Sequence, residues 1–125
     1  MTADPAERAA AIVEAINSRE PERISGLLDP NSRVITGRTT HLGPDAICAW
    51  ARKEYDHLVR RYAIDEYRIA GETVLALGHV QYAWTESGVV GDSSPIAITI
   101  ELDGELLRLL RLQDDPAAAL AAFGD

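Results

Sequence analysis

The sequence has little of what several functional classes require. Cysteine occurs once in 125 residues, at Cys48, so no internal disulfide can form. No cluster of cysteine and histidine has the spacing of a metal site, and we expect no metal and no cofactor. Basic residues are also scarce: twelve lysines and arginines face twenty aspartates and glutamates, which leaves a formal net charge of −8. Phosphate groups repel such a chain, so we expect neither nucleic acid nor a membrane surface as its partner.

Long hydrophobic runs are absent as well. The first residues lack the basic and apolar regions of a signal peptide, and no segment is long enough to span a bilayer. With a single cysteine, this indicates a reducing, cytoplasmic location. What the chain does have is 46% hydrophobic residues, enough to form one domain, residues 1–125, around a single core.

The most regular pattern lies between Ser94 and Asp114. Two β-rich runs flank Asp103-Gly104, a dipeptide typical of two-residue hairpin turns. The first run alternates strictly, so one of its faces must be buried. That surface is called the isoleucine face here and consists of Ile96, Ile98 and Ile100. The second run carries leucine on both faces, which indicates a sheet that is covered on both sides.

The other elements follow from caps, turns and periodicity. Asp4-Pro5 predicts the start of a helix that ends near Asn17, and Gly71-Glu72 predicts a hairpin turn. The further expected elements are a short helix around Ile24, a strand at 33–36, a loop at 37–42, a helix over 43–58, strands at 60–70 and 73–84, and a last helical turn over 117–123. This order predicts an α+β domain in which a curved sheet wraps around helices.

The order of elements, together with four short segments, resembles the nuclear transport factor two-like superfamily and, within it, the SnoaL-like and ketosteroid-isomerase-like proteins. The segments are Ala15-Ile16-Asn17, Leu27-Leu28-Asp29-Pro30, Gly43-Pro44-Asp45-Ala46-Ile47 and Asp103-Gly104-Glu105-Leu106. The resemblance implies a cone-shaped half-barrel, in which one curved, mostly antiparallel sheet wraps around three N-terminal helices, with a pocket at its open end. Members include isomerases, cyclases, dehydratases, epoxide hydrolases and binding modules, so the fold alone implies no single function.

The resemblance also implies where catalytic groups would stand. The three polar roles of ketosteroid isomerase would fall at Ile12, at Thr36 or Gly37, and at Ala97, and none of these residues is ionisable. Isomerisation by that mechanism is therefore not expected. The pocket aromatics of the family would fall at Trp50, Tyr82 and Trp84. Each of these could equally be an ordinary core residue.

The two lines of reasoning disagree about which sheet face lines the cone. The residue pattern places the isoleucine face against the helices, whereas the resemblance places Ala97, Thr99 and Leu110 there. We expect the second arrangement, with the isoleucine face buried in a homodimer that forms through the outer sheet face.

Asp65 is the candidate acid or base. The turn predicted at Gly71-Glu72 places Asp65 opposite Gly78. A carboxyl group among apolar rings is disfavoured in its charged form, which suits it to acid–base catalysis. The alternative is a solvated strand residue. The other face of the hairpin brings Glu66 diagonal to His79, which is either a general-base pair or a polar patch on the outer surface.

Two residues are candidates for reading a polar end of a ligand. Arg108, opposite Thr99 in the predicted register, would project toward the cone and bind a carboxylate or phosphate. The alternative is an ion pair with Glu101. His41 lies in the loop near the expected pocket mouth, where it would titrate, or it is simply exposed.

Two functions therefore stay open. The first is a small-molecule enzyme of the SnoaL-like type, with isomerase, cyclase, dehydratase or hydrolase chemistry on a hydrophobic, ring-bearing substrate. Asp65 would be its acid or base, while Trp50, Tyr82 and Trp84 hold the rings and Arg108 or His41 reads the polar end. The second is a non-catalytic module of the same fold that binds a small hydrophobic molecule or dimerises, which the three empty isomerase positions favour.

Overall fold

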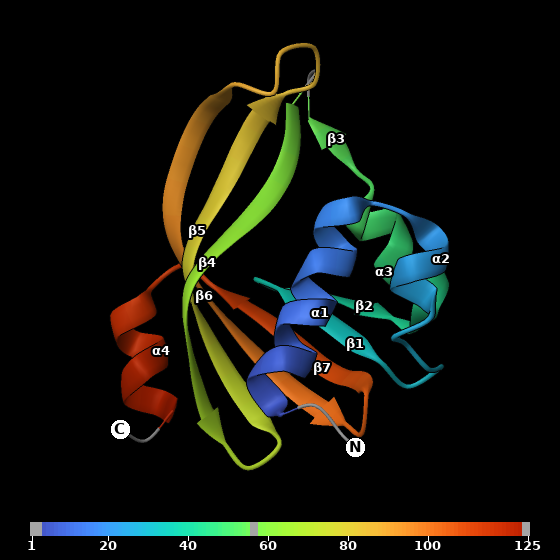
Figure 1. Ribbon diagram of the computed structural model, residues 1–125, viewed down its shortest axis with the longest axis vertical. Coiled ribbons are helices and arrows are strands. Elements are labelled where there is room, and N and C mark those ends of the chain that lie inside the picture. Colours follow the sequence, from blue (N-terminus) through green and yellow to red (C-terminus); the bar gives the residue numbers. More distant parts are fainter. Residues whose placement is uncertain (1–3, 56–57, 124–125) are drawn as a thin grey trace.

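Helices lie on both sides of one curved sheet. The computed structural model describes residues 4–55 and 58–123. Helices α1 (Pro5–Ser18), α2 (Pro21–Ser25) and α3 (Gly43–Ala51) lie on the concave side, and α4 (Pro116–Phe123) lies on the other side, as Figure 1 shows. In the described part of the chain, none of the helices combines the length and the apolar character that crossing a membrane requires.

The first helix begins as its sequence predicts. The Asp4 side chain accepts a hydrogen bond of 2.9 Å from the Glu7 backbone N–H, and Pro5 occupies the first helical position. The helix ends where Arg19 adopts a left-handed conformation, with φ 58°. Its buried stripe, which faces the sheet, contains Ala9, Ile12, Val13 and Ile16.

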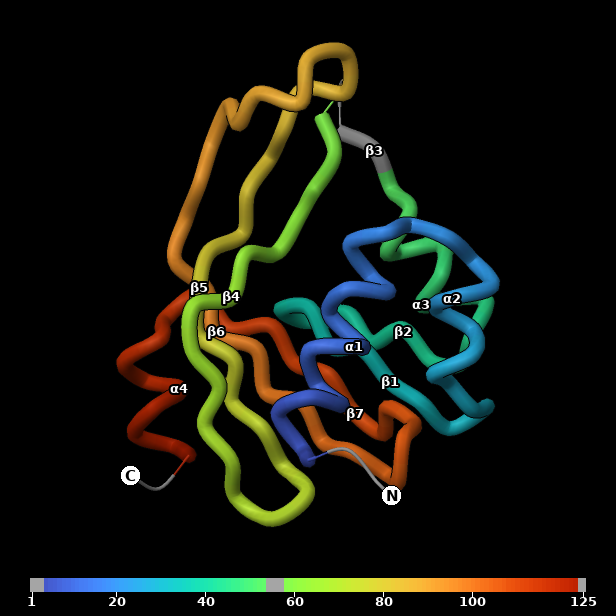
Figure 2. Tube along the Cα trace, in the orientation of Figure 1, coloured from blue at the N-terminus to red at the C-terminus, as the bar shows by residue number. Residues whose placement is uncertain are grey.

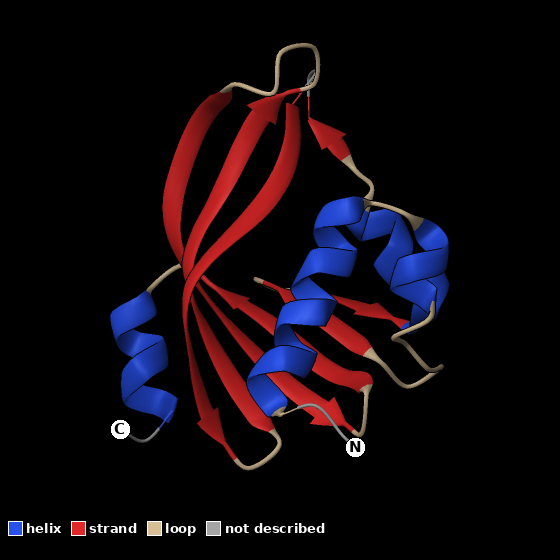
Figure 3. Cartoon of the chain, in the orientation of Figure 1, coloured by secondary structure: helices blue, strands red, loops and turns tan. Residues whose placement is uncertain are grey.

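The sheet contains seven strands in the order β2-β1-β7-β6-β5-β4-β3. Figure 3 shows the strands of this curved sheet in red and the helices in blue. The four strands that come last in the sequence, β4 to β7, form the predicted antiparallel meander. Strand β1 joins this meander by pairing parallel to β7. The strands are β1 (Arg33–Thr36), β2 (Thr39–Leu42), β3 (Glu54–Tyr55), β4 (Leu58–Ala70), β5 (Thr73–Trp84), β6 (Val90–Asp103) and β7 (Leu106–Gln113).

Two elements differ from the predicted ones because some of their residues pair as strands instead. The predicted loop 37–42 contains β2, which pairs with β1 through a turn at Gly37, where φ is +59°. The predicted helix over 43–58 ends at Ala51, and Leu58 instead pairs with Trp84 as the first residue of β4. Pairing with the long β4–β5 hairpin thus overrides local helix propensity.

The two hairpin turns have the same chemistry. Gly71, with φ +63°, opens the β4–β5 turn as predicted. In the β6–β7 hairpin the turn is Gly104-Glu105, one residue later than the predicted Asp103-Gly104, and again the glycine comes first, with φ +61°. The pairing also shifts between Glu101 and Leu102, so Ile100 faces Leu110. A regular two-residue turn at Asp103-Gly104 predicts Leu107 at that place.

The isoleucine face lies inside the molecule. Each of its three residues is at most 4% exposed and packs in the core with the α1 stripe. On the outer face, Ala97 and Leu75 are covered by Ala119 of α4. The expected burial of the isoleucine face between subunits is therefore wrong, because the helices already remove these large side chains from water. The residue pattern was the correct guide here.

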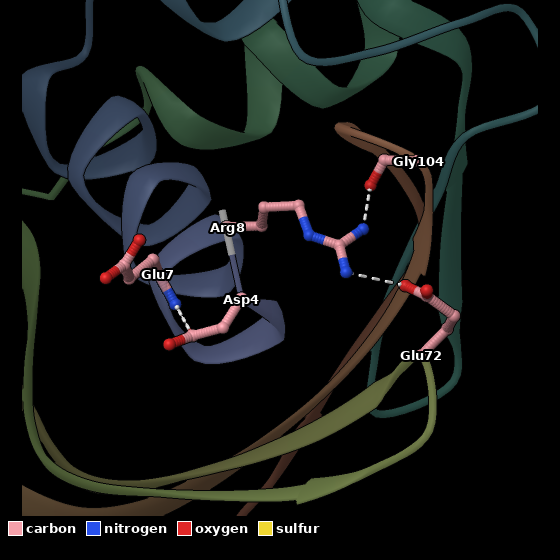
Figure 4. A network of polar contacts seen from close by, with 5 residues as sticks. All are labelled: Asp4, Glu7, Arg8, Glu72 and Gly104. Carbon is pink, nitrogen blue, oxygen red and sulfur yellow. Dashed lines mark hydrogen bonds and ion pairs between the residues drawn. The ribbon is translucent and has the colours of Figure 1, made fainter. Parts of the chain in front are cut away.

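A buried arginine joins α1 to both hairpin turns. Arg8 is 8% exposed, and its Nη2 lies 3.0 Å from the Glu72 carboxylate in the β4–β5 turn. Its Nη1 donates to the Gly104 carbonyl in the β6–β7 turn, and Figure 4 shows the side chain reaching both. Charge-assisted hydrogen bonds thus tie both hairpin turns to the start of α1.

Candidate functional site

A cavity of about 630 Å³ lies between the inner face of the sheet, the β1–β2 hairpin and the end of α3. The course of these elements can be followed along the trace in Figure 2. The volume suits a small organic molecule. The lining residues are Thr36, Gly37, Thr39, His41, Trp50, Lys53, Arg60, Tyr62, Val80, Tyr82, Ile96, Leu112 and Asp114. The cavity therefore combines aromatic and aliphatic walls with a few charged groups.

The best-defined part of this wall is the contact of Arg60 with two rings. The Arg60 guanidinium carbon lies 4.5 Å from the centroid of the Trp50 ring and 5.6 Å from that of Tyr62. Its Nη2 donates to the Trp50 backbone carbonyl at 2.9 Å. The two rings lie 6.4 Å apart and are nearly parallel, with 27° between their planes. These cation–π contacts hold a positive charge at the cavity wall.

His41 stands beside this group on β2. Its ring centroid lies 6.0 Å from that of Trp50, and its Nε2 is 3.5 Å from the Thr36 hydroxyl oxygen. Partial burial and, second, the positive charge of Arg60 lower the pKa of the His41 imidazole below its ordinary value of 6.5. At neutral pH the imidazole is therefore uncharged and can accept a proton.

This arrangement predicts how His41 titrates. In NMR titrations its pKa should lie below 6.5, and the Arg60→Gln substitution should raise that pKa because one lowering charge is removed. The unfolded chain then binds more protons at His41 than the native state does. The free energy of unfolding should consequently fall as the pH drops from 6.5 through the pKa of native His41. A pKa that stays unchanged in the Arg60 variant would contradict the assigned cause.

Among the described residues, two cationic side chains and one carboxylate line the cavity. Lys53, which follows α3, and Asp114, which follows β7, are both exposed, whereas Arg60 on β4 is half-buried.

Asp65 does not line the cavity, so its predicted position is wrong. Ile64 pairs with Gly78 and Glu66 pairs with Leu77, which leaves Asp65 as the extra residue of a β-bulge. Its side chain is 72% exposed, and its Oδ2 lies 3.6 Å from Nδ1 of His79 on the outer face. Glu66, the expected partner of His79, instead pairs with Arg68 at 2.6 Å.

The same bulge explains what the sequence analysis missed. Because side chains alternate along a strand, one extra residue exchanges the two faces of everything beyond it. A register with Asp65 opposite Gly78 predicts Tyr62 on the outer face, together with Glu66. With the bulge, Tyr62 points inward, and Arg60 lies on the same inner face. A glycine in the middle of a strand, here Gly78, is the one sequence signal that could have indicated the bulge.

Two further candidates lie away from the cavity. Trp84, at the end of β5, is 47% exposed and belongs to the exposed tip of the β5–β6 loop. Arg108 is exposed and lines a separate depression with Glu101 and Arg33, because the β6–β7 register differs from the predicted one. Both predicted positions are therefore wrong, whereas Trp50, Tyr82 and His41 do line the cavity.

Comparisons with known proteins show which fold this architecture represents. No protein-family profile matches the chain, and no curated protein is similar to it in sequence. Among solved structures, an NTF2-like protein of unknown function from Burkholderia pseudomallei is 17% identical, with a TM-score of 0.73 over 99% of this chain and 100% of the other. The chain has the NTF2-like fold. The predicted cone-shaped α+β architecture is thereby confirmed, with its sheet open and not closed into a barrel.

Two other structures show how varied the proteins of NTF2-like fold are. A candidate SnoaL-like polyketide cyclase from Shewanella denitrificans is 15% identical, with a TM-score of 0.73 over 95% of this chain and 96% of the other. A protein of ketosteroid-isomerase-like fold from Catenulispora acidiphila, solved with trimethylamine, is 16% identical, with a TM-score of 0.72 over 92% and 90%. Identities this low establish the fold and not the activity.

Within this NTF2-like fold, the three positions implied by ketosteroid isomerase are scattered. Ile12 is 2% exposed in the core, Thr36 and Gly37 line the cavity, and Ala97 lies on the outer face under α4. None of these side chains can exchange a proton near neutral pH. Acid–base chemistry in the cavity would therefore have to use other groups, and among the described residues the geometry of His41 suits it.

Proposed function

We propose that the cavity is the active site of a small-molecule enzyme of the SnoaL-like type that moves a proton on a hydrophobic, ring-bearing substrate, with His41 as the base. The observation that carries this proposal is the His41 imidazole held between Trp50 and Thr36 in the wall of a ring-lined cavity. A histidine of this kind is suited to general-base catalysis at neutral pH. The likeness in fold to a candidate polyketide cyclase agrees with this assignment.

The step that isomerases, cyclases and dehydratases share can be written for this site. A nitrogen of the His41 imidazole takes a proton from a carbon next to a substrate carbonyl. The electron pair of the broken C–H bond moves to the carbonyl oxygen, which gives an enolate and an imidazolium. The positive charge of Arg60 would stabilise the enolate oxygen. In an isomerase, the imidazolium would return the proton to another carbon of a conjugated enolate. In a cyclase, the enolate carbon would attack a second carbonyl, whose oxygen then takes the proton from the imidazolium, so that His41 is uncharged again.

Exchange of hydrogen for deuterium tests this step before the full reaction is known. Neutral cyclic and aryl ketones are incubated with the protein in heavy water, and the carbons next to the carbonyl are followed by NMR. We expect catalysed exchange for at least one ketone, and a loss of about 100-fold or more in His41→Gln. The matched control is His79→Gln, since His79 lies on the outer face and should leave the exchange rate unchanged.

Two results would overturn the proposal. One is an absence of catalysed exchange across the whole set of ketones. The other is exchange that survives in His41→Gln at the unmodified rate. The second candidate function, a binding module without catalysis, is favoured by the apolar or uncharged residues at Ile12, Thr36 and Ala97. It predicts saturable binding of ketones with no exchange.

A further inference from the structure

The two edges of β4 are paired to different extents. One edge pairs with β5 from end to end, apart from the bulge at Asp65. In the part of the chain that the structure describes, the other edge pairs with β3 at Leu58 and Val59. Backbone groups on a strand edge need partners wherever water is excluded. Beyond Val59 this edge borders the cavity, because Arg60 and Tyr62 line it, so a residue that pairs with the edge there helps to fix the cavity wall.

Asn17 pairs with this edge at Tyr62. Its Oδ1 accepts a hydrogen bond of 2.8 Å from the Tyr62 backbone N–H, and its Nδ2 donates one of 2.8 Å to the Tyr62 carbonyl oxygen. A residue of an antiparallel strand directs both of these groups to the same side. One side-chain amide can therefore bond to both, as a neighbouring strand would. Because Asn17 lies in the last turn of α1, the two bonds join the end of this helix to β4.

These bonds fall on a stretch of β4 that has little other support. Tyr62 lies between the end of the β3 pairing at Val59 and the bulge at Asp65. A bulge leaves one residue unpaired and disrupts the ladder locally. Since a side chain adopts one of a few rotamers on its backbone, fixing the backbone of Tyr62 also fixes where its ring can lie.

From Tyr62 the contacts continue to the proposed base. Tyr62 is 5% exposed, and its ring lies 6.4 Å from the Trp50 ring. The Arg60 guanidinium lies over both rings, and the His41 ring is 6.0 Å from that of Trp50. A shift of β4 at Tyr62 would therefore change the surroundings of the imidazole. Asn17 itself is not among the described residues that line the cavity.

We propose that Asn17 is a positioning residue of this active site. Its amide fixes Tyr62 in β4, and the stacked rings of Tyr62 and Trp50 in turn hold the Arg60 guanidinium in the wall that contains His41. This inference rests on the proposed function, because it assigns to Asn17 an effect on the same base through intervening residues. Asn17 would not touch the substrate.

The Asn17→Ala substitution tests this role, because it removes both bonds without changing the net charge. The folded variant should lose roughly tenfold or more of the catalysed deuterium exchange, since small displacements of catalytic groups slow a reaction strongly. Burial and, second, the charge of Arg60 lower the pKa of His41. A loosened wall weakens both effects, so in NMR titrations this pKa should rise toward 6.5. A residue that only stabilised the fold would change neither quantity in the folded variant.

Two further charges of the wall do not obscure this measurement. Lys53 and Asp114, which also line the cavity, lie outside β4. A change in the His41 pKa of the variant therefore reports on the β4 side of the wall.

The matched control is the neighbouring Ser18→Ala variant. The hydrogen bonds described for the Ser18 hydroxyl join it to the Ala15 carbonyl and to the Glu20 N–H, both close to it in the chain. Removing them disturbs the same end of α1 and should leave the exchange rate and the His41 pKa unchanged. Circular dichroism must show that each variant is folded. If Asn17→Ala is not, Asn17→Ser takes its place, since a serine hydroxyl can still bond to one of the two backbone groups.

The possible results are distinct. The inference is overturned by an unchanged rate or an unchanged His41 pKa in the folded Asn17 variant, by equal changes in Ser18→Ala, or by loss of the folded state in both Asn17 variants. Each of these leaves the proposed function standing as long as the unmodified protein catalyses exchange. An absence of exchange in the unmodified protein overturns the proposed function instead. A His41 pKa that rises in Asn17→Ala would then still support the hold of Asn17 on the cavity wall.

Discussion

Replacing Ile98 with aspartate should unfold this protein. Ile98 is 1% exposed and lies between Ala76 and Leu112 on the inner face of the sheet. The substitution removes about 2 kcal/mol of stabilisation from apolar burial. It also buries a carboxylate without a partner, which lowers the free energy of unfolding by roughly several kcal/mol more. Because domains of this size are stable by only about 5–15 kcal/mol, most of the molecules should be unfolded at 25 °C.

Circular dichroism and size-exclusion chromatography measure this outcome. The conservative Ile98→Val variant is the control, and it should remain folded at a cost of about 1 kcal/mol. The experiment also separates the observed packing from the arrangement first expected, in which the isoleucine face lies between subunits. In that arrangement, Ile98→Asp would yield a monomer or an aggregate. A folded monomer with native circular dichroism would contradict the buried position.

The Gly78→Ala substitution should destabilise the protein by about 3 kcal/mol, although it adds a single methyl group. A Cβ atom at this position would overlap the Ala63 carbonyl oxygen and lie 2.7 Å from the Ile64 Cα atom. Both atoms belong to the backbone of β4, so no side-chain rotation relieves the overlap. The bulge at Asp65 creates this close approach, since it bends β4 over Gly78.

Urea unfolding of two glycine variants isolates the cause. Gly26 follows α2 in a helical conformation, and a Cβ atom there would meet the Glu22 carbonyl oxygen at 3.4 Å. The stability of the Gly26→Ala variant should therefore be unchanged or up to about 1 kcal/mol higher, because alanine lowers the conformational entropy of the unfolded chain. A Gly78→Ala variant as stable as the unmodified protein would show that β4 does not approach β5 this closely.

Several elements could be predicted because their signals are local. The cap at Asp4 and the turn at Gly71 each depend on residues within one turn of chain, and both form as predicted. The burial of Ile96, Ile98 and Ile100 follows from alternation alone. The resemblance was less reliable than this pattern for the orientation of the face, because a shared fold does not specify which residues of a distant sequence occupy each register position.

The candidate site could be predicted in part. Trp50 and Tyr82 lie in the cavity wall as expected, and His41 is there although its segment is a strand and not a loop. Lys53, Arg60 and Asp114 were missed as wall residues. Their positions depend on how α3, β4 and β7 end around one space, and no residue pattern within a single element reports that arrangement.

The sequence by itself determined the order of the helices and of the long strands, the turn-forming glycines and the alternation that buries one side of β6, because each depends on neighbours along the chain. Only the tertiary structure decided which face of β4 looks inward, since a single inserted residue, Asp65, exchanges the two faces and is accommodated by Gly78 on another strand. That exchange brings Arg60 and Tyr62 to Trp50 and His41, so the chemistry of the cavity depends on pairing between distant segments.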